Sequence, residues 1–153
     1  VYPAAGRRAP VYGDVMVLNE AAQAALNSSK LAHLTTINPD GSTQVSVVWA
    51  KTDGDDILIG HLGAGQKVRN LGRDPRATVT VISGERNEIG LDEYIVVHGL
   101  ATTEAGGAPE LLQELAHGYL GPDVKFPPMP DPPPGTVIRI TANRVGGVGP
   151  WTE

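Results

Sequence analysis

Cysteine is absent from the sequence, which excludes disulfide bonds and thiolate metal ligands. Long apolar runs are absent too, because the longest run near the start, residues 15–18, falls far short of the ~18 residues of a membrane span. Positive charge is scarce: 12 lysines and arginines stand against 17 acidic residues, and the formal net charge is −5. A nucleic-acid partner needs a broad basic surface. We therefore expect a cytoplasmic protein with no membrane span and no bound nucleic acid.

The sequence also lacks the patterns of a metal site and of a hydrolase site. Neither HxxH nor HExxH spacing occurs among the four histidines, His33, His61, His98 and His117. No GxSxG nucleophile motif is present. The acidic cluster at 53–56 lies in a predicted turn, where solvation accounts for its charge. We expect no metal ion.

The length of 153 residues suits one domain with a sizeable core. Residues 1–14 show no hydrophobic period and are interpreted as a loose N-terminal arm. Residues 15–153 are predicted to form the single domain. Its 19 glycines and 13 prolines imply many turns.

Strands dominate the predicted first half of the domain. Asn19 can cap a short helix that ends near residue 28. Segments 31–37 and 44–52 are rich in β-forming residues and flank the turn sequence NPDG, which predicts a β-hairpin. The turn sequence DGD then leads into a strand at 56–62, which predicts a three-strand meander.

The second half is predicted to continue with antiparallel strands and short helices. The elements are a helix over 65–73, strands over 77–83 and 93–103, a helix over 109–119 and a last strand over 136–145. About six such strands with helices at their ends indicate a mainly β (α+β) barrel or sandwich. The proline-rich segment 126–135 is typical of polyproline II structure. The glycine-rich end around Trp151 is predicted to be an exposed or lid-like tail.

One short stretch gathers four of the twelve basic residues behind two glycines: "GAGQKVRNLGRDPRATVTV", residues 63–81. It matches neither the P-loop pattern nor the dinucleotide pattern GxGxxG. What remains is a helix N-terminus that carries Lys67, and such a terminus attracts anions. Lys67 and Asn70 share one helix face, while Arg69 and Arg73 share another. Read locally, a solvated helix whose arginines pair with carboxylates is the alternative.

Three further residues are candidates for contact with a flat ligand. His61 ends the strand that leads into the basic turn, where it can lie beside a bound ring. Trp49 and Trp151 are the only tryptophans, and each is either a core residue or the cover of a flat ligand.

The segments "KLAHLTTINPDGSTQVSVVWA" and "QKVRNLGRDPRATVTV" resemble the split β-barrel flavin and deazaflavin-binding superfamily. This is the pyridoxamine 5'-phosphate oxidase-like group, and the resemblance is to its branch that uses coenzyme F420. It covers about residues 19–150. It implies an antiparallel split β-barrel and a homodimer with two cofactor sites at the subunit interface.

The resemblance also implies roles for particular residues. The cofactor's phosphate would lie at Lys67 and Gln66, with Asn70 nearby, and Arg69 and Arg73 would guide a longer acidic tail. The positions implied along the ring and the ribityl chain are Gln44, Ser46, Val48, Gly60 and His61. Lys51 matches a position that meets a substrate phosphate in the oxidase branch, and its role here is open.

One departure from the family pattern bears on the cofactor. The FMN-using oxidases have an arginine at the position of Ser46 and an Arg-Lys pair where this chain has Gln66 and Lys67. FMN ends in a compact dianion that suits such arginines. A single lysine suits the phosphodiester of coenzyme F420 better.

The leading hypothesis is therefore an F420H2-dependent reductase that gives a hydride to an unsaturated small molecule. His61, Lys51 or solvent would return the proton. An FMN-dependent oxidase or reductase, and a non-catalytic cofactor-binding protein, are the alternatives.

Overall fold

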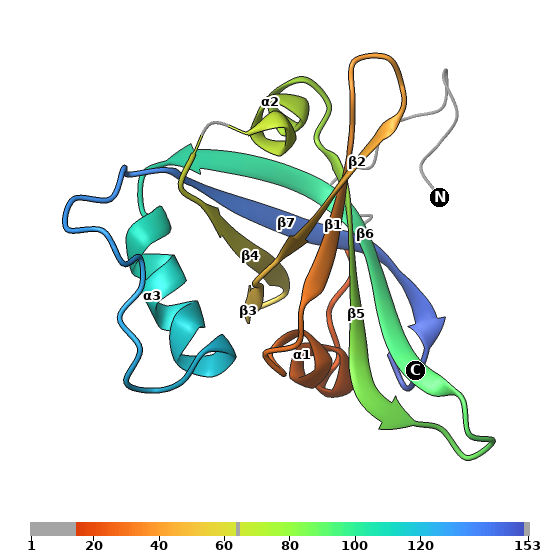
Figure 1. The fold of residues 1–153 in the computed structure, drawn as a ribbon. Coiled ribbons are helices and arrows are strands. Elements are labelled where there is room, and N and C mark those ends of the chain that lie inside the picture. Colours follow the sequence, from red (N-terminus) through yellow and green to blue (C-terminus); the bar gives the residue numbers. More distant parts are fainter. Residues whose placement is uncertain (1–14, 64, 152–153) are drawn as a thin grey trace.

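A computed structural model describes residues 15–63 and 65–151 (Figure 1). Over these residues the chain forms one mainly antiparallel β-sheet and three short helices. The elements are α1 (Glu20–Leu26), β1 (Ala32–Ile37), β2 (Thr43–Val48), β3 (Lys51–Asp53), β4 (Asp56–His61), α2 (Gln66–Arg73), β5 (Arg76–Arg86), β6 (Asp92–Ala105), α3 (Ala108–Tyr119) and β7 (Thr136–Val148). The predicted mainly β class is confirmed. The predicted N-terminal arm, residues 1–14, lies outside the described residues.

The sheet has seven strands rather than about six, in the order β2-β1-β5-β6-β7-β4-β3. The expected strand 44–52 is divided, because β2 pairs with β1 at one edge and β3 pairs with β4 at the other. The predicted hairpin of β1 and β2 is confirmed, and β3 pairs with β4 across the predicted DGD turn. The three strands do not lie side by side as a meander, because β2 and β3 are at opposite edges of the sheet and β4 also pairs with β7.

Only residues 49 and 50 separate the two edge strands β2 and β3. Three Cα steps reach at most about 11 Å, so the sheet must curl until its edges approach each other. No ladder joins β2 to β3 in the described part of the chain. The result is a strongly curled sheet that stays open, in place of the expected barrel.

The helices begin and end close to the predicted residues. The side chain of Asn19 caps α1 by accepting a hydrogen bond from the Ala22 N–H. Gly65 precedes α2, and no side chain caps that helix. The longest of the described helices, α3, has 12 residues, and none is long and apolar enough to span a membrane.

Two apolar clusters hold these elements together. The larger one fills the curl of the sheet and includes residues of every long strand. A smaller one lies under α3 and is built from Leu111, Leu112 and Leu115, with Trp49 and Phe126 packed against it. The site described below lies where the two clusters meet.

The C-terminal end corrects one prediction. Trp151 is 6% exposed and belongs to the larger core, and its indole N–H donates to the Tyr94 carbonyl at 2.8 Å. The expected exposed or lid-like tail is therefore wrong. The neighbouring glycines extend β7 to Val148, because its ladder with β6 continues through them.

Candidate functional site

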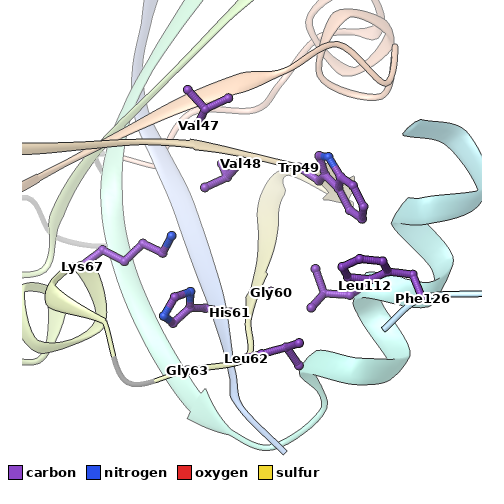
Figure 2. A pocket seen from close by; sticks show the side chains of 10 residues that line it. All are labelled: Val47, Val48, Trp49, Gly60, His61, Leu62, Gly63, Lys67, Leu112 and Phe126. Atoms are coloured by element: carbon purple, nitrogen blue, oxygen red, sulfur yellow. The ribbon is translucent and has the colours of Figure 1, made fainter. Parts of the chain in front are cut away.

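A cavity of about 310 Å³ opens between the end of β2, the end of β4, the start of α2 and the side of α3 (Figure 2). Ten residues line it: Val47, Val48, Trp49, Gly60, His61, Leu62, Gly63, Lys67, Leu112 and Phe126. The lining is divided into two ends. The apolar end carries Trp49, Leu112 and Phe126, and the basic end carries His61 and Lys67.

Gly60 is the reason that α3 can form one wall of this cavity. A Cβ at Gly60 would lie 3.1 Å from Cγ of Leu112, which is tighter than ordinary packing. The absence of a side chain in β4 therefore allows the helix to approach, and Leu112 reaches the cavity.

Lys67 extends from the first turn of α2 into the basic end (Figure 2). The side chain is about half-buried, and this burial lowers the pKa of the Lys67 ammonium. Among residues 15–63 and 65–151, no carboxylate pairs with it and no group accepts a hydrogen bond from it. A partly desolvated charge without a partner costs stability. A bound anion would offset that cost.

His61 lies beside Lys67 at the end of β4 (Figure 2). Its Nε2 is buried and has no hydrogen-bond partner among the described residues. Burial lowers the pKa of His61, and the positive charge of Lys67 lowers it further. Gly65 makes room for the ring, because a Cβ there would lie 2.7 Å from His61 Nε2. Gly65 thus leaves space for the His61 ring and also precedes the first residue of α2.

The basic end has the properties of an anion site. It joins the partnerless ammonium of Lys67, the orphaned Nε2 of His61 and the uncapped N-terminus of α2. Unpaired N–H groups at a helix start favour negative charge. Lys67, His61 and the start of α2 therefore lie together, and a single bound anion could serve all three.

We expect Lys67→Met to raise the pKa of His61. The pKa of His61 should still stay below the ordinary value of a histidine, because burial is the larger cause of its lowering and remains in the variant. An NMR titration of the His61 ring protons measures the change. His98 is the internal control, since burial alone lowers its pKa. An equal shift at His98, or none at His61, would contradict the electrostatic effect of Lys67 on His61.

The structure separates the predicted site residues into groups. Val48, Gly60, His61 and Lys67 line the cavity together. Gln44 and Gln66 instead line a second hollow of about 490 Å³ with Asn38, Pro39 and Asp40. Ser46 faces the core side of β2, opposite Leu34, and lines neither hollow.

Lys51 and Trp151 lie apart from the cavity. Lys51 Nζ donates to Glu114 Oε1 at 2.7 Å and lines a third hollow of about 160 Å³. Trp151 is packed in the larger core. Of the two candidate proton donors, only His61 therefore reaches the cavity.

Asn70 is fully buried and has a structural role. Its Nδ2 donates to Thr36 Oγ1 at 3.0 Å and to Asn38 Oδ1 at 2.9 Å. Its Oδ1 accepts from Gln66 Nε2 at 2.8 Å and from Arg73 Nη1 at 3.4 Å. An amide makes about four hydrogen bonds, so these contacts leave no atom for a ligand. Asn70 fixes α2, and with it Lys67, against the sheet.

The two arginines predicted to guide an acidic tail lie on the exposed side of α2. Arg69 donates to Gln66 Oε1 at 2.9 Å, and Arg73 donates to the Ile37 carbonyl. Neither side chain lines the cavity. Both contact residues of α2, and Arg73 also contacts the end of β1.

Sequence reasoning missed the residues of the apolar wall. Leu112 is predicted only as part of the helix over 109–119, and Leu62 only as the end of the strand at 56–62. Phe126, the one phenylalanine of the chain, lies at the start of the proline-rich segment. Its isolation among prolines is a weak signal that it is placed for contact.

Solved structures resemble this fold. A protein named F420 Reductase is 25% identical, with a TM-score of 0.67, and the match covers 81% of this chain and 94% of that one. The conserved hypothetical protein Rv2991 from Mycobacterium tuberculosis is also 25% identical, with a TM-score of 0.66. The match covers 93% of this chain and 89% of that one. A putative pyridoxamine 5'-phosphate oxidase from Listeria innocua shares the fold, with a TM-score of 0.59 and 15% identity. The match covers 82% of this chain and 93% of that one.

The sequence itself also matches a known family. No curated protein matches the chain. A family profile described as pyridoxamine 5'-phosphate oxidase matches residues 18–149, which include every strand and helix described above. The chain belongs to the pyridoxamine 5'-phosphate oxidase family.

Proposed function

We propose that the protein is an F420H2-dependent reductase that transfers a hydride to an unsaturated small molecule. The observation that carries this proposal is the partnerless pair at the basic end of the cavity, Lys67 and His61. The similarity to the protein named F420 Reductase, at 25% identity over 81% of the chain, supports it.

The residues present fit the phosphate and the polar chain of such a cofactor. Lys67 and the start of α2 would hold the phosphate, because their N–H groups lack acceptors at this place. The amides of Gln44 and Gln66 line the neighbouring hollow, and amides donate to and accept from hydroxyl groups. Arg69 and Arg73, on the exposed side of α2, would meet an acidic tail.

The charge of the cavity favours coenzyme F420 over FMN. Among the described lining residues, Lys67 is the one lysine or arginine. Ser46 and Gln66, where the FMN-using oxidases have arginines, add no charge. FMN remains the second candidate, because the family profile is that of a flavin-using oxidase.

When bound, the reduced deazaflavin supplies a hydride to an electron-poor double bond. The chain's own residues orient the partners and move a proton. The apolar wall excludes water from the reacting atoms. We assign proton return to His61, whose ring lines the cavity. Since the protonated ring is the donor, the rate should fall as pH rises through the pKa of His61.

Titration with coenzyme F420 and with FMN tests the cofactor. We expect micromolar binding of F420, followed by loss of reduced F420 when an electron-poor alkene, imine or quinone is added. Micromolar FMN binding without F420 affinity would contradict the proposal in favour of an FMN enzyme. Tight F420 binding without turnover over the whole panel would favour a carrier.

We also propose that a second copy of the chain covers one face of the sheet. Val45, Val47, Ile82 and Tyr94 are exposed, and the strand register places them on the face opposite the core. Val47 also lines the cavity. An exposed apolar surface of this kind is typical of an interface, and here it continues into the site.

We expect Val45→Lys to shift the protein from dimer to monomer and to weaken F420 binding. The side chain is 55% exposed in the single chain, so the substitution costs the monomer little while it charges the interface. Light scattering after size exclusion measures the mass. Ile89→Lys, at the exposed hairpin tip, is the control. A wild-type monomer at micromolar concentration would refute the dimer.

A further inference from the structure

Phe126 reaches the apolar end of the cavity from a segment without helix or strand, residues 120–135. Gln113 of α3 holds this segment in place. Its Nε2 donates to the Val124 carbonyl at 2.9 Å, and its Oε1 accepts from the Phe126 N–H at 3.1 Å. One side chain thus binds the backbone on both sides of residue 125.

The position of Phe126 determines the shape of the apolar end. Its ring centroid lies 5.0 Å from that of Trp49, at an interplanar angle of 58°. Trp49 stacks on Tyr119 at 5.3 Å and 15°. Both Trp49 and Phe126 line the cavity, and Figure 2 shows them beside Leu112. A shift of the Phe126 backbone would therefore open this wall.

The chemistry of Gln113 suits this role. An amide both donates and accepts, whereas a carboxylate only accepts and a thioether does neither usefully. The basic end is held differently: Lys67 extends from α2 and His61 from β4, and no hydrogen bond joins Gln113 to either residue. Gln113 can thus act on one end of the cavity alone.

We propose that Gln113 is a positioning residue for the acceptor: it sets Phe126 against Trp49, so that the apolar end admits flat, apolar ring compounds. The assignment of this end to the hydride acceptor rests on the proposed function. The cofactor's phosphate, at the other end, is independent of Gln113. The residue therefore governs the choice of acceptor and not the binding of the cofactor.

The first test needs no cofactor. Anilinonaphthalene sulfonate has flat apolar rings and one anionic group, which match the two ends of the cavity. In a Trp151→Phe background, energy transfer from Trp49 reports its binding. We expect Gln113→Met to weaken binding about tenfold, as for the loss of the hydrogen bonds that hold Phe126 in place. Gln113→Glu should weaken binding less, because the Phe126 N–H keeps its acceptor.

Glu110→Gln, an exposed change on the same helix, is the matched control and should leave the dissociation constant within about twofold of wild type. Equal affinities of Gln113→Met and wild type would overturn the proposal. Should Gln113→Met fail to fold, Phe126→Leu decides the matter, since it removes the ring and keeps both Gln113 hydrogen bonds. Unchanged probe binding in Phe126→Leu would also overturn it.

The second test uses a naphthoquinone as the acceptor. One hydride from reduced F420 and one proton convert the quinone to the hydroquinone, and oxidised F420 returns. We expect Gln113→Met to raise the KM for the quinone about tenfold while the Kd for F420 and kcat change little. A parallel rise of the F420 Kd would overturn the selective role. Failure of wild type to bind F420 would refute the proposed function, and the probe experiment would still decide on Gln113.

Discussion

Replacing Lys67 with methionine is expected to weaken the binding of coenzyme F420 by about 1.5–3 kcal/mol, the contribution of a hydrogen bond to a charged group. This corresponds to a dissociation constant about 10- to 150-fold higher. The reason is the isolation of the ammonium: it is half-buried at the start of α2, and no described residue neutralises it. Fluorescence titration of F420 measures the change.

The same variant should not lose stability. Because burial lowers the pKa of Lys67, the folded state holds this proton less tightly than the unfolded chain does. The charged form therefore costs stability at neutral pH, and methionine removes that cost. Lys30→Met is the control for loss of a lysine outside the cavity, and it should bind F420 like wild type. An unchanged Kd for Lys67→Met would place the anion elsewhere.

Asn70→Ala is expected to lower the free energy of unfolding by about 2–4 kcal/mol. The substitution deletes a fully buried amide, and Thr36 and Asn38 lose the donor they share. Buried polar groups without partners cost about 1–3 kcal/mol each, and the lost side chain leaves a cavity as well. Urea denaturation followed by circular dichroism measures the difference.

Asn87→Ala is the matched control, because the same side chain is removed from an exposed turn. Asn87 Oδ1 accepts from the N–H groups of Ile89 and Leu91 in the hairpin between β5 and β6. Exposed hydrogen bonds of this kind contribute about 1 kcal/mol or less. Equal losses in the two variants would show that the Asn70 network adds nothing beyond one local contact.

Local sequence patterns predicted most of the secondary structure. The NPDG turn between two β-rich segments predicted the hairpin of β1 and β2, and Asn19 and Gly65 marked the starts of α1 and α2. Each of these signals depends only on residues close together in the chain, so it can be recognised in the sequence. Lys67 and His61 were predicted for the same reason, since both flank one glycine turn.

Long-range pairing decided the rest. Segment 44–52 reads as one strand, and only its two different partners divide it at residues 49 and 50. The burial of Trp151 depends on β6, far away in the sequence. Asn70 reads as a polar helix residue, but the Thr36 and Asn38 side chains that accept from its amide nitrogen come from β1 and the turn after it. A short sequence pattern does not predict contacts between residues that are far apart in the chain.

The step between the two sheet edges has a consequence for amide exchange. Ala50 lies between β2 and β3, and its N–H donates to the Tyr119 hydroxyl at 3.0 Å instead of to a ladder partner. That hydroxyl sits on α3, so this amide is protected only while the helix stays docked. Exchange of most strand amides requires separation of the sheet. The exchange rate of the Ala50 amide therefore reports how often α3, one wall of the cavity, undocks from the sheet.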